Sequence, residues 1–176
     1  MKTNTKKTVT LAMLAAVSVI LATFIRIPFP GAPFLEYDPA DVSIIIASLL
    51  FGPVSGVILT VVVSVLQGFT VSASSGIVGI VMHIFSTGMY AIIAGVFKGD
   101  RSFKRVVVAV AMGAFAMTLI MIPLNMIFTP LFMGQPFEAV KAMLLPIIIP
   151  FNLIKSVVNG IVAVVIYFIV KKTKII

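Results

Sequence analysis

Three polar side chains stand out in the last apolar segment of the chain: Asn152, Lys155 and Asn159. At 100° per residue these positions lie within about 60° of one another on a helix, so they share one face. Two amides and an ammonium can donate to and accept from a polar ligand. Lys155 is also close enough to the end of its segment to snorkel to the membrane surface. The two amides beside it favour a ligand-binding role.

A second polar stripe joins Gly76, Gly79, His83, Thr87 and Tyr90 at spacings of three and four residues. One interpretation places Gly79 and His83 against a ligand. The alternative is helix packing, because small residues allow close approach and a histidine can bond across helices in lipid. For His83 alone, packing is slightly favoured. We predict no metal site, because such a site needs several His, Cys or carboxylate ligands together.

Two further residues, Asn125 and Glu36, are candidate ligand contacts. Asn125 lies near the outer end of its segment, just before Thr129, where it either faces a ligand or satisfies freed backbone groups. Glu36 lies in a connection that combines aromatic and acidic side chains. In the same connection, Asp41 is expected to cap the N-terminus of the next helix.

The composition determines what kind of elements must position these side chains. Of the 176 residues, 61% are hydrophobic and 10% are charged, whereas soluble domains carry about 25% charged residues. The chain therefore belongs in lipid, where its length allows about six or seven spans of about 20 residues. There is no cysteine, which excludes disulfides and thiolate chemistry.

The basic residues indicate the orientation of these spans. The formal net charge is +8, and ten of the 13 Lys and Arg residues fall at 2–7, 98–105 and 171–174. Cytoplasmic loops of membrane proteins collect Lys and Arg, so all three groups are expected inside. The excess of Lys and Arg over Asp and Glu then indicates the orientation of the chain in the membrane and not nucleic-acid binding. All three groups lie inside only if the apolar stretch 42–66 breaks at Gly52-Pro53 into two helices.

We therefore predict an all-α integral membrane protein with six transmembrane helices, both termini cytoplasmic, and one domain over residues 1–176. The first segment is expected to be a retained helix and not a cleaved signal. The long outer connections, 27–40 and 128–145, place the ligand site at the outer face. The helices are expected at about residues 8–26, 41–51, 53–69, 76–97, 104–127 and 146–170.

Several motifs of energy-using and catalytic proteins are missing from the sequence. It has no phosphate-binding loop, no zinc-protease helix motif and no serine nucleophile elbow. We expect no enzymatic activity and no ATP hydrolysis by this chain. A binding protein of this kind either facilitates diffusion or takes its energy from partner subunits.

Five short motifs together resemble a known family, and they cover nearly the whole chain. They are Ala12-x-x-x-Ala16, Phe29-Pro-Gly31, Asp41 followed by Phe51-Gly-Pro53-x-x-Gly56, Gly76 to Gly79, and Asn152-Leu-Ile-Lys155. The family is the substrate-binding S components of energy-coupling factor (ECF) vitamin transporters. The chain is most similar to the riboflavin-specific members, and the last motif is the most specific.

The resemblance implies roles for four of the candidate residues. Asn152 and Lys155 would bond the isoalloxazine ring of riboflavin, with Asn125 and Glu36 as further contacts. The ribityl hydroxyls would face polar atoms around residues 70–79. Riboflavin would be bound as substrate with no cofactor, and FMN is a possible second ligand.

The resemblance also implies partners and a location. A transmembrane coupling subunit would dock near Ala12 and Ala16, and two cytoplasmic ATPases would drive inward release of the vitamin. The protein would be a multi-pass protein of the bacterial cell membrane, in contact with lipid. Two alternatives stay open: the same fold with pantothenate, folate or a thiamin precursor, and a structural or pore-forming membrane protein in which Lys155 snorkels.

Overall fold

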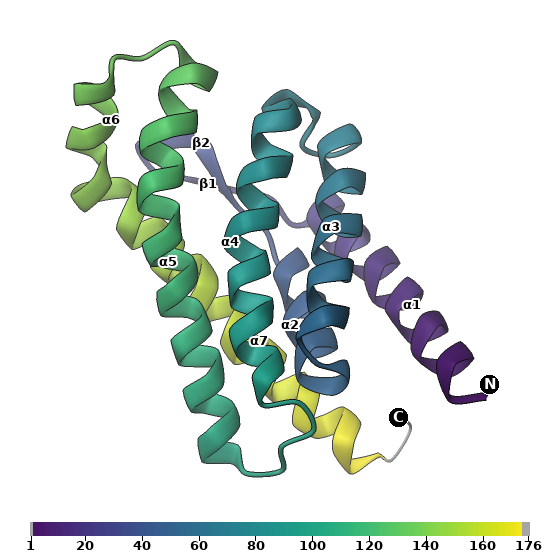
Figure 1. Cartoon of the computed structure of the whole chain (residues 1–176). Helices are drawn as coiled ribbons and strands as arrows, with labels where there is room; N and C mark the ends of the chain where they lie inside the picture. The colour runs from purple at the N-terminus through teal and green to yellow at the C-terminus, as the bar shows by residue number, and fades with distance from the viewer. Residues whose placement is uncertain (1, 174–176) are drawn as a thin grey trace.

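The computed structural model describes residues 2–173, with side chains from residue 5 onward. Over this range the chain forms a helical bundle with one β-hairpin (Figure 1). It also has a 3-10 turn at Ala73–Ser75 and a π-helix at Leu144–Ile148. The α-helices are α1 (Lys2–Phe24), α2 (Ala40–Phe51), α3 (Pro53–Phe69), α4 (Gly76–Val96), α5 (Phe103–Met133), α6 (Phe137–Met143) and α7 (Ile149–Lys172).

The helices have the length and composition expected of a membrane protein. Within the described residues, four helical stretches are long and apolar enough to cross a bilayer, at Thr5–Phe24, Ala73–Val96, Phe103–Met133 and Phe137–Lys172. Helices α2 and α3 are apolar but shorter. They separate at Gly52, which has a φ of 92°, a conformation that favours glycine, and Pro53 begins α3. This confirms the predicted break at Gly52-Pro53.

The prediction of a second long outer connection at residues 128–145 is wrong, because most of these residues are helical. Helix α5 continues through Pro123 and Pro130 as far as Met133, and α6 and the π-helix follow before α7 begins at Ile149. In water a proline usually ends a helix, but in an apolar bundle neighbouring groups can satisfy the freed carbonyls. The first outer connection also departs from an all-α fold, since it forms strands β1 (Ile27–Phe29) and β2 (Ala32–Tyr37).

Helix α2 lies at the centre of the bundle, and ten of its 12 residues are buried. Around it, α4, α5 and α7 approach one another closely at Tyr90, which is fully buried. A Cβ atom on Gly113 of α5 or on Gly160 of α7 would overlap the Tyr90 side chain. Glycine at these two positions therefore sets the close spacing of the three helices.

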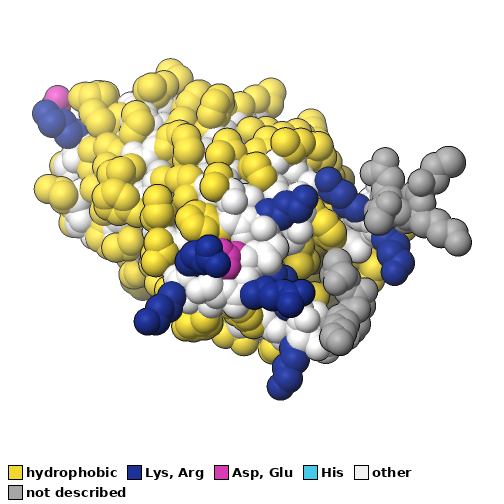
Figure 2. Space-filling view, turned by 60° about the horizontal axis from the view of Figure 1, so that its bottom comes forward, with side chains coloured by type: hydrophobic (Ala, Val, Ile, Leu, Met, Phe, Trp, Pro, Cys, Tyr) yellow, Lys and Arg dark blue, Asp and Glu magenta, His cyan; other side chains and the backbone are white. Residues whose placement is uncertain are grey.

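Most of the basic side chains gather at one end of a largely apolar surface. Figure 2 shows Lys and Arg clustered at the end of the molecule that carries both described chain ends and the α4–α5 link. The β-hairpin and the α3–α4 connection lie toward the opposite end (Figure 1). The bundle therefore has a basic end and a hairpin end.

Candidate ligand-binding site

A cavity of about 190 Å³ lies at the hairpin end of the bundle. Its walls come from β2, the α3–α4 connection, and helices α3, α4, α5 and α7. Six of the seven candidate ligand contacts line it: Glu36, Gly79, His83, Asn125, Asn152 and Lys155. The fold thus brings together side chains that are more than 100 positions apart in the sequence.

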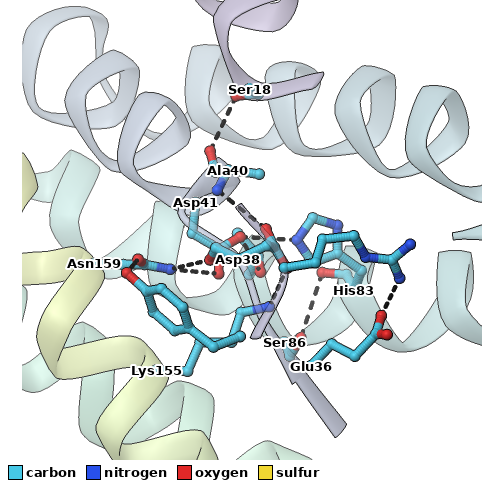
Figure 3. A network of polar contacts seen from close by, with 12 residues as sticks. Ser18, Glu36, Asp38, Ala40, Asp41, His83, Ser86, Lys155 and Asn159 are labelled. Atoms are coloured by element: carbon cyan, nitrogen blue, oxygen red, sulfur yellow. Dashed lines mark hydrogen bonds and ion pairs between the residues drawn. The ribbon is translucent and has the colours of Figure 1, made fainter. Parts of the chain in front are cut away.

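Lys155 points into the protein and pairs with a carboxylate of the segment after β2. Its Nζ donates to Oδ2 of Asp38 over 2.7 Å, and its side chain is 11% exposed. The close-up in Figure 3 draws this contact together with its neighbours. A lysine that snorkelled would carry its ammonium to the membrane surface, so the geometry favours the binding interpretation over that alternative.

Asn152 and Asn125 are almost fully buried in the cavity wall, each 1% exposed. The Asn152 side-chain nitrogen donates to the Ile148 carbonyl over 2.8 Å, and Asn125 donates in the same way to Met121. Thr129 donates to the Asn125 side-chain oxygen over 2.9 Å. These bonds to groups one turn away along the chain fix the orientation of both amides in the cavity wall.

Asn159 is placed differently from the other candidates, because it is not among the residues that line the cavity. Its nitrogen donates to the Asp38 carbonyl over 3.1 Å, and its side-chain oxygen accepts from the Tyr37 hydroxyl over 2.9 Å. Burial raises the pKa of Tyr37, which keeps that hydroxyl a donor. The structure therefore gives Asn159 a role in anchoring the end of β2 to α7.

Asp41 is a network centre and not the helix cap that its position predicts. It is 1% exposed, and its carboxylate oxygen Oδ1 lies 2.8 Å from Nε2 of His83 and 3.1 Å from the Thr87 hydroxyl. His83 in turn contacts the Ser64 hydroxyl over 2.7 Å. Helix α2 has Pro39 at its N-cap and no side-chain capping bond, and the Asp38 side chain accepts from the Ala40 N–H in the turn before the helix. The Asp41 carboxylate thus bonds to His83 and Thr87 of α4 instead of to the backbone at the start of its own helix. His83 both joins α2 to α4 in this way and lines the cavity.

Glu36 is paired instead of free. Arg26, which follows α1, donates both to the Glu36 carboxylate and to the Val71 carbonyl in the α3–α4 connection. The Glu36 side chain is 36% exposed. Together these bonds tie the hairpin to the α3–α4 connection at the rim of the cavity.

Sequence reasoning missed several residues of the cavity wall, including Asp38, Arg26, Ser64 and Gln67. A signal existed for two of them, since Thr60, Ser64 and Gln67 follow each other at helical spacing. For Asp38 no local signal exists, because its partner Lys155 is 117 residues away.

The cavity wall combines polar and apolar side chains. Among the described residues, no group of three His, Cys, Asp or Glu side chains is placed to hold a metal ion. Such a site suits a flat aromatic ligand with hydrogen-bonding groups at its edge. The apolar lining comes from Phe34, Leu35, Val78, Ile80, Met82, Met117, Met121, Phe132 and Phe151.

The fold and the site define a class of membrane transport subunit. Residues 6–167 match the family described as "ECF transporter, substrate-specific component", so the chain belongs to that family. A solved structure entitled "Structure and mechanism of the S component of a bacterial ECF transporter" superposes with a TM-score of 0.81 at 28% identity, covering 97% of this chain and 98% of that one. The chain is thus a multi-pass integral membrane protein.

Among individual proteins, the chain is similar to two curated riboflavin transporters. FmnP of Bacillus subtilis (strain 168) is 32% identical over 89% of this chain and 87% of its own length. RibU of Staphylococcus aureus (strain TCH60) is 30% identical over 92% of this chain and 88% of its own length. These relatives are transporter components and not enzymes, which confirms that expectation for the family.

Proposed function

We propose that this chain is the riboflavin-binding subunit of an ECF transporter. The observation that carries the proposal is the cavity wall in which Asn125, Asn152 and Lys155 meet. The similarity to the riboflavin transporters FmnP and RibU supports riboflavin as the vitamin. Flavin carries imide and carbonyl groups along one edge of its ring, which match two amides and an ammonium. Its flat aromatic body suits the methionine and phenylalanine side chains among the residues that line the cavity.

The proposal includes an orientation in the membrane. Residues 1–176 form one membrane domain with six spans, and the basic end with both termini faces the cytoplasm. The clustering of Lys and Arg at that end (Figure 2) supports this orientation. The cavity at the opposite end then takes riboflavin from outside.

A direct binding measurement tests the proposed function. Purified full-length protein is expected to quench added riboflavin fluorescence saturably at nanomolar concentrations, with one vitamin per chain, and to carry flavin absorbance from the cells. Pantothenate, folate and a thiamin precursor serve as the comparison ligands. Saturable binding of one of these in place of riboflavin would contradict the choice of vitamin. Ion leak in liposomes without any saturable binding would contradict the whole assignment.

The proposal also includes a coupling subunit and two ATPases, with α1 as the docking surface. Ala12 and Ala16 are both exposed on α1, and they lie one helical turn apart. Two small side chains at that spacing let another helix approach closely. In this scheme the ATPases supply the energy for inward release of the vitamin.

Enlarging this surface is expected to impair transport without affecting binding. With Ala16→Phe, riboflavin uptake should fall about fivefold or more, because an overpacked helix contact costs about 1–3 kcal/mol. Uptake is measured in cells that contain the coupling subunit and the ATPases, and binding is measured on the purified subunit. Ala111→Phe is the matched control, because Ala111 is equally an exposed alanine but lies on α5, away from α1 (Figure 1). Equal uptake by both variants would rule out docking at Ala16.

A further inference from the structure

A groove of about 280 Å³ lies between α5 and α7, and it shares no lining residue with the ligand cavity. All nine side chains that line it are apolar. They include Val107, Val110 and Ala114 of α5, and Val157, Ile161 and Val164 of α7. The groove opens to the outside of the bundle, since Val107 is 39% and Ile161 is 60% exposed. Such a wall offers no hydrogen bond to water and suits an apolar chain.

The groove covers the part of α5 nearest the basic end of the bundle. It begins at Phe103, the first residue of α5, and reaches Ala114, a distance of about 16 Å along a helix. The hydrocarbon core of a bilayer is about 30 Å thick, so one leaflet contributes about 15 Å. The groove therefore matches an acyl chain in one leaflet, and it is too short for a helix that crosses the whole membrane.

Two lysines flank the end of the groove that lies at the basic end. There the ring of Phe103 contacts the ring of Phe168 on α7, with their centroids 5.6 Å apart. Lys104 follows Phe103, and Lys172 lies one helical turn beyond Phe168, on the face of α7 that lines the groove. Both lysines are exposed, and neither forms an ion pair with an acid of the described residues. Two such ammonium groups beside an apolar groove complement the phosphate of an anionic lipid.

We infer that this groove binds one acyl chain of an anionic phospholipid, whose phosphate is held by Lys104 and Lys172. The inference goes beyond the proposed function and takes from it only the orientation, which places this lipid in the cytoplasmic leaflet. A second copy of this chain suits the groove less well, because two copies oriented alike in the membrane would bring their lysines together. The proposed docking helix α1 packs against α2 and α3, so docking there leaves the groove open to lipid.

Native mass spectrometry of the full-length protein, purified in detergent, tests the headgroup contact. The protein is mixed with equal amounts of phosphatidylglycerol and phosphatidylcholine that carry the same acyl chains. One phosphatidylglycerol per chain should stay bound, about 5- to 25-fold more often than phosphatidylcholine, because each lysine favours an anionic lipid about fivefold. Lys172→Met should lower this preference about fivefold. Lys6→Met is the matched control and should leave it unchanged, because Lys6 is an exposed lysine at the same end but on α1, outside the groove wall.

A second pair of variants tests the apolar part of the groove. Val107 and Val108 are neighbouring valines of α5, 39% and 52% exposed, of which Val107 lines the groove and Val108 does not. Val107→Phe should occupy the groove and reduce retention of both lipids, whereas Val108→Phe should retain them as the wild type does. The melting temperature of each variant without added lipid identifies a loss that comes from misfolding.

Three results would overturn the inference: a wild type without preference for phosphatidylglycerol, equal preference in Lys172→Met and Lys6→Met, or equal retention by the two valine variants. A dimer in the same spectra that Val107→Phe abolishes would assign the groove to a second copy of the chain and would overturn it as well. Failure of the proposed function is a distinct result, because a wild type that retained phosphatidylglycerol but did not bind riboflavin would leave this inference standing.

Discussion

Lys155→Met is expected to weaken riboflavin binding by about 10- to 150-fold, the effect of losing one hydrogen bond to a charged group. The substitution keeps most of the apolar stem of the side chain and removes the ammonium. Two contributions are lost together: the donor to the flavin ring edge, and the partner of the Asp38 carboxylate, which lies 2.7 Å away and is 18% exposed. A carboxylate without its partner in this cavity is also unfavourable beside the carbonyl oxygens of a flavin.

The measurement is a fluorescence-quenching titration of the variant beside the wild type. Lys104→Met is the matched control, because Lys104 is an exposed lysine at the basic end of the bundle, away from the cavity, and its removal should leave the affinity unchanged. Asn152→Ala should also weaken binding, by the smaller amount of a neutral hydrogen bond, about 2- to 13-fold. If Lys155→Met and Asn152→Ala both bind riboflavin as the wild type does, the site is assigned to the wrong wall.

The part of the site that could be predicted from the sequence is the part that follows helical periodicity. Asn152 and Lys155 share a helix face at a spacing of three residues, and the structure places both in the cavity wall. Asn159 lies on the same helix face four residues further on. Its amide bonds to Tyr37 and Asp38 at the end of β2 and does not line the cavity. Periodicity predicts a shared face and not the depth to which a cavity reaches along it.

The part that could not be predicted depends on contacts between distant segments. The Asp38–Lys155 and Asp41–His83 contacts join residues 117 and 42 positions apart, and no local spacing indicates either. The end of α5 is also missed, because the helix predicted to end near residue 127 continues through Pro130 to Met133 in apolar surroundings. The hairpin of Ile27–Phe29 and Ala32–Tyr37 has strands of three and six residues, too short for an alternating pattern to stand out from a loop.

Asp41→Ala is expected to lower the melting temperature more than any other single change at the hairpin end. The Asp41 carboxylate joins three helices, since it lies in α2, contacts His83 and Thr87 of α4, and accepts from Asn159 of α7 over 3.5 Å. Alanine leaves these buried polar groups without their common partner, which costs about 3–5 kcal/mol. For a chain of this length, that cost corresponds to a decrease of about 6–20 °C.

Thermal unfolding of the purified variants in one detergent tests this expectation, and two controls define its cause. Glu138→Ala removes an acid that is 78% exposed and lies 3.7 Å from an exposed lysine, so it should cost less than about 1 kcal/mol. Asp41→Asn keeps the shape and one acceptor oxygen for Thr87, and should lose less stability than Asp41→Ala. A melting temperature of Asp41→Ala equal to that of Glu138→Ala would mean that the network does not hold α2, α4 and α7 together. The other contacts that position the site, such as Lys155 with Asp38, would then suffice, and the same Asp41→Ala protein would bind riboflavin with wild-type affinity.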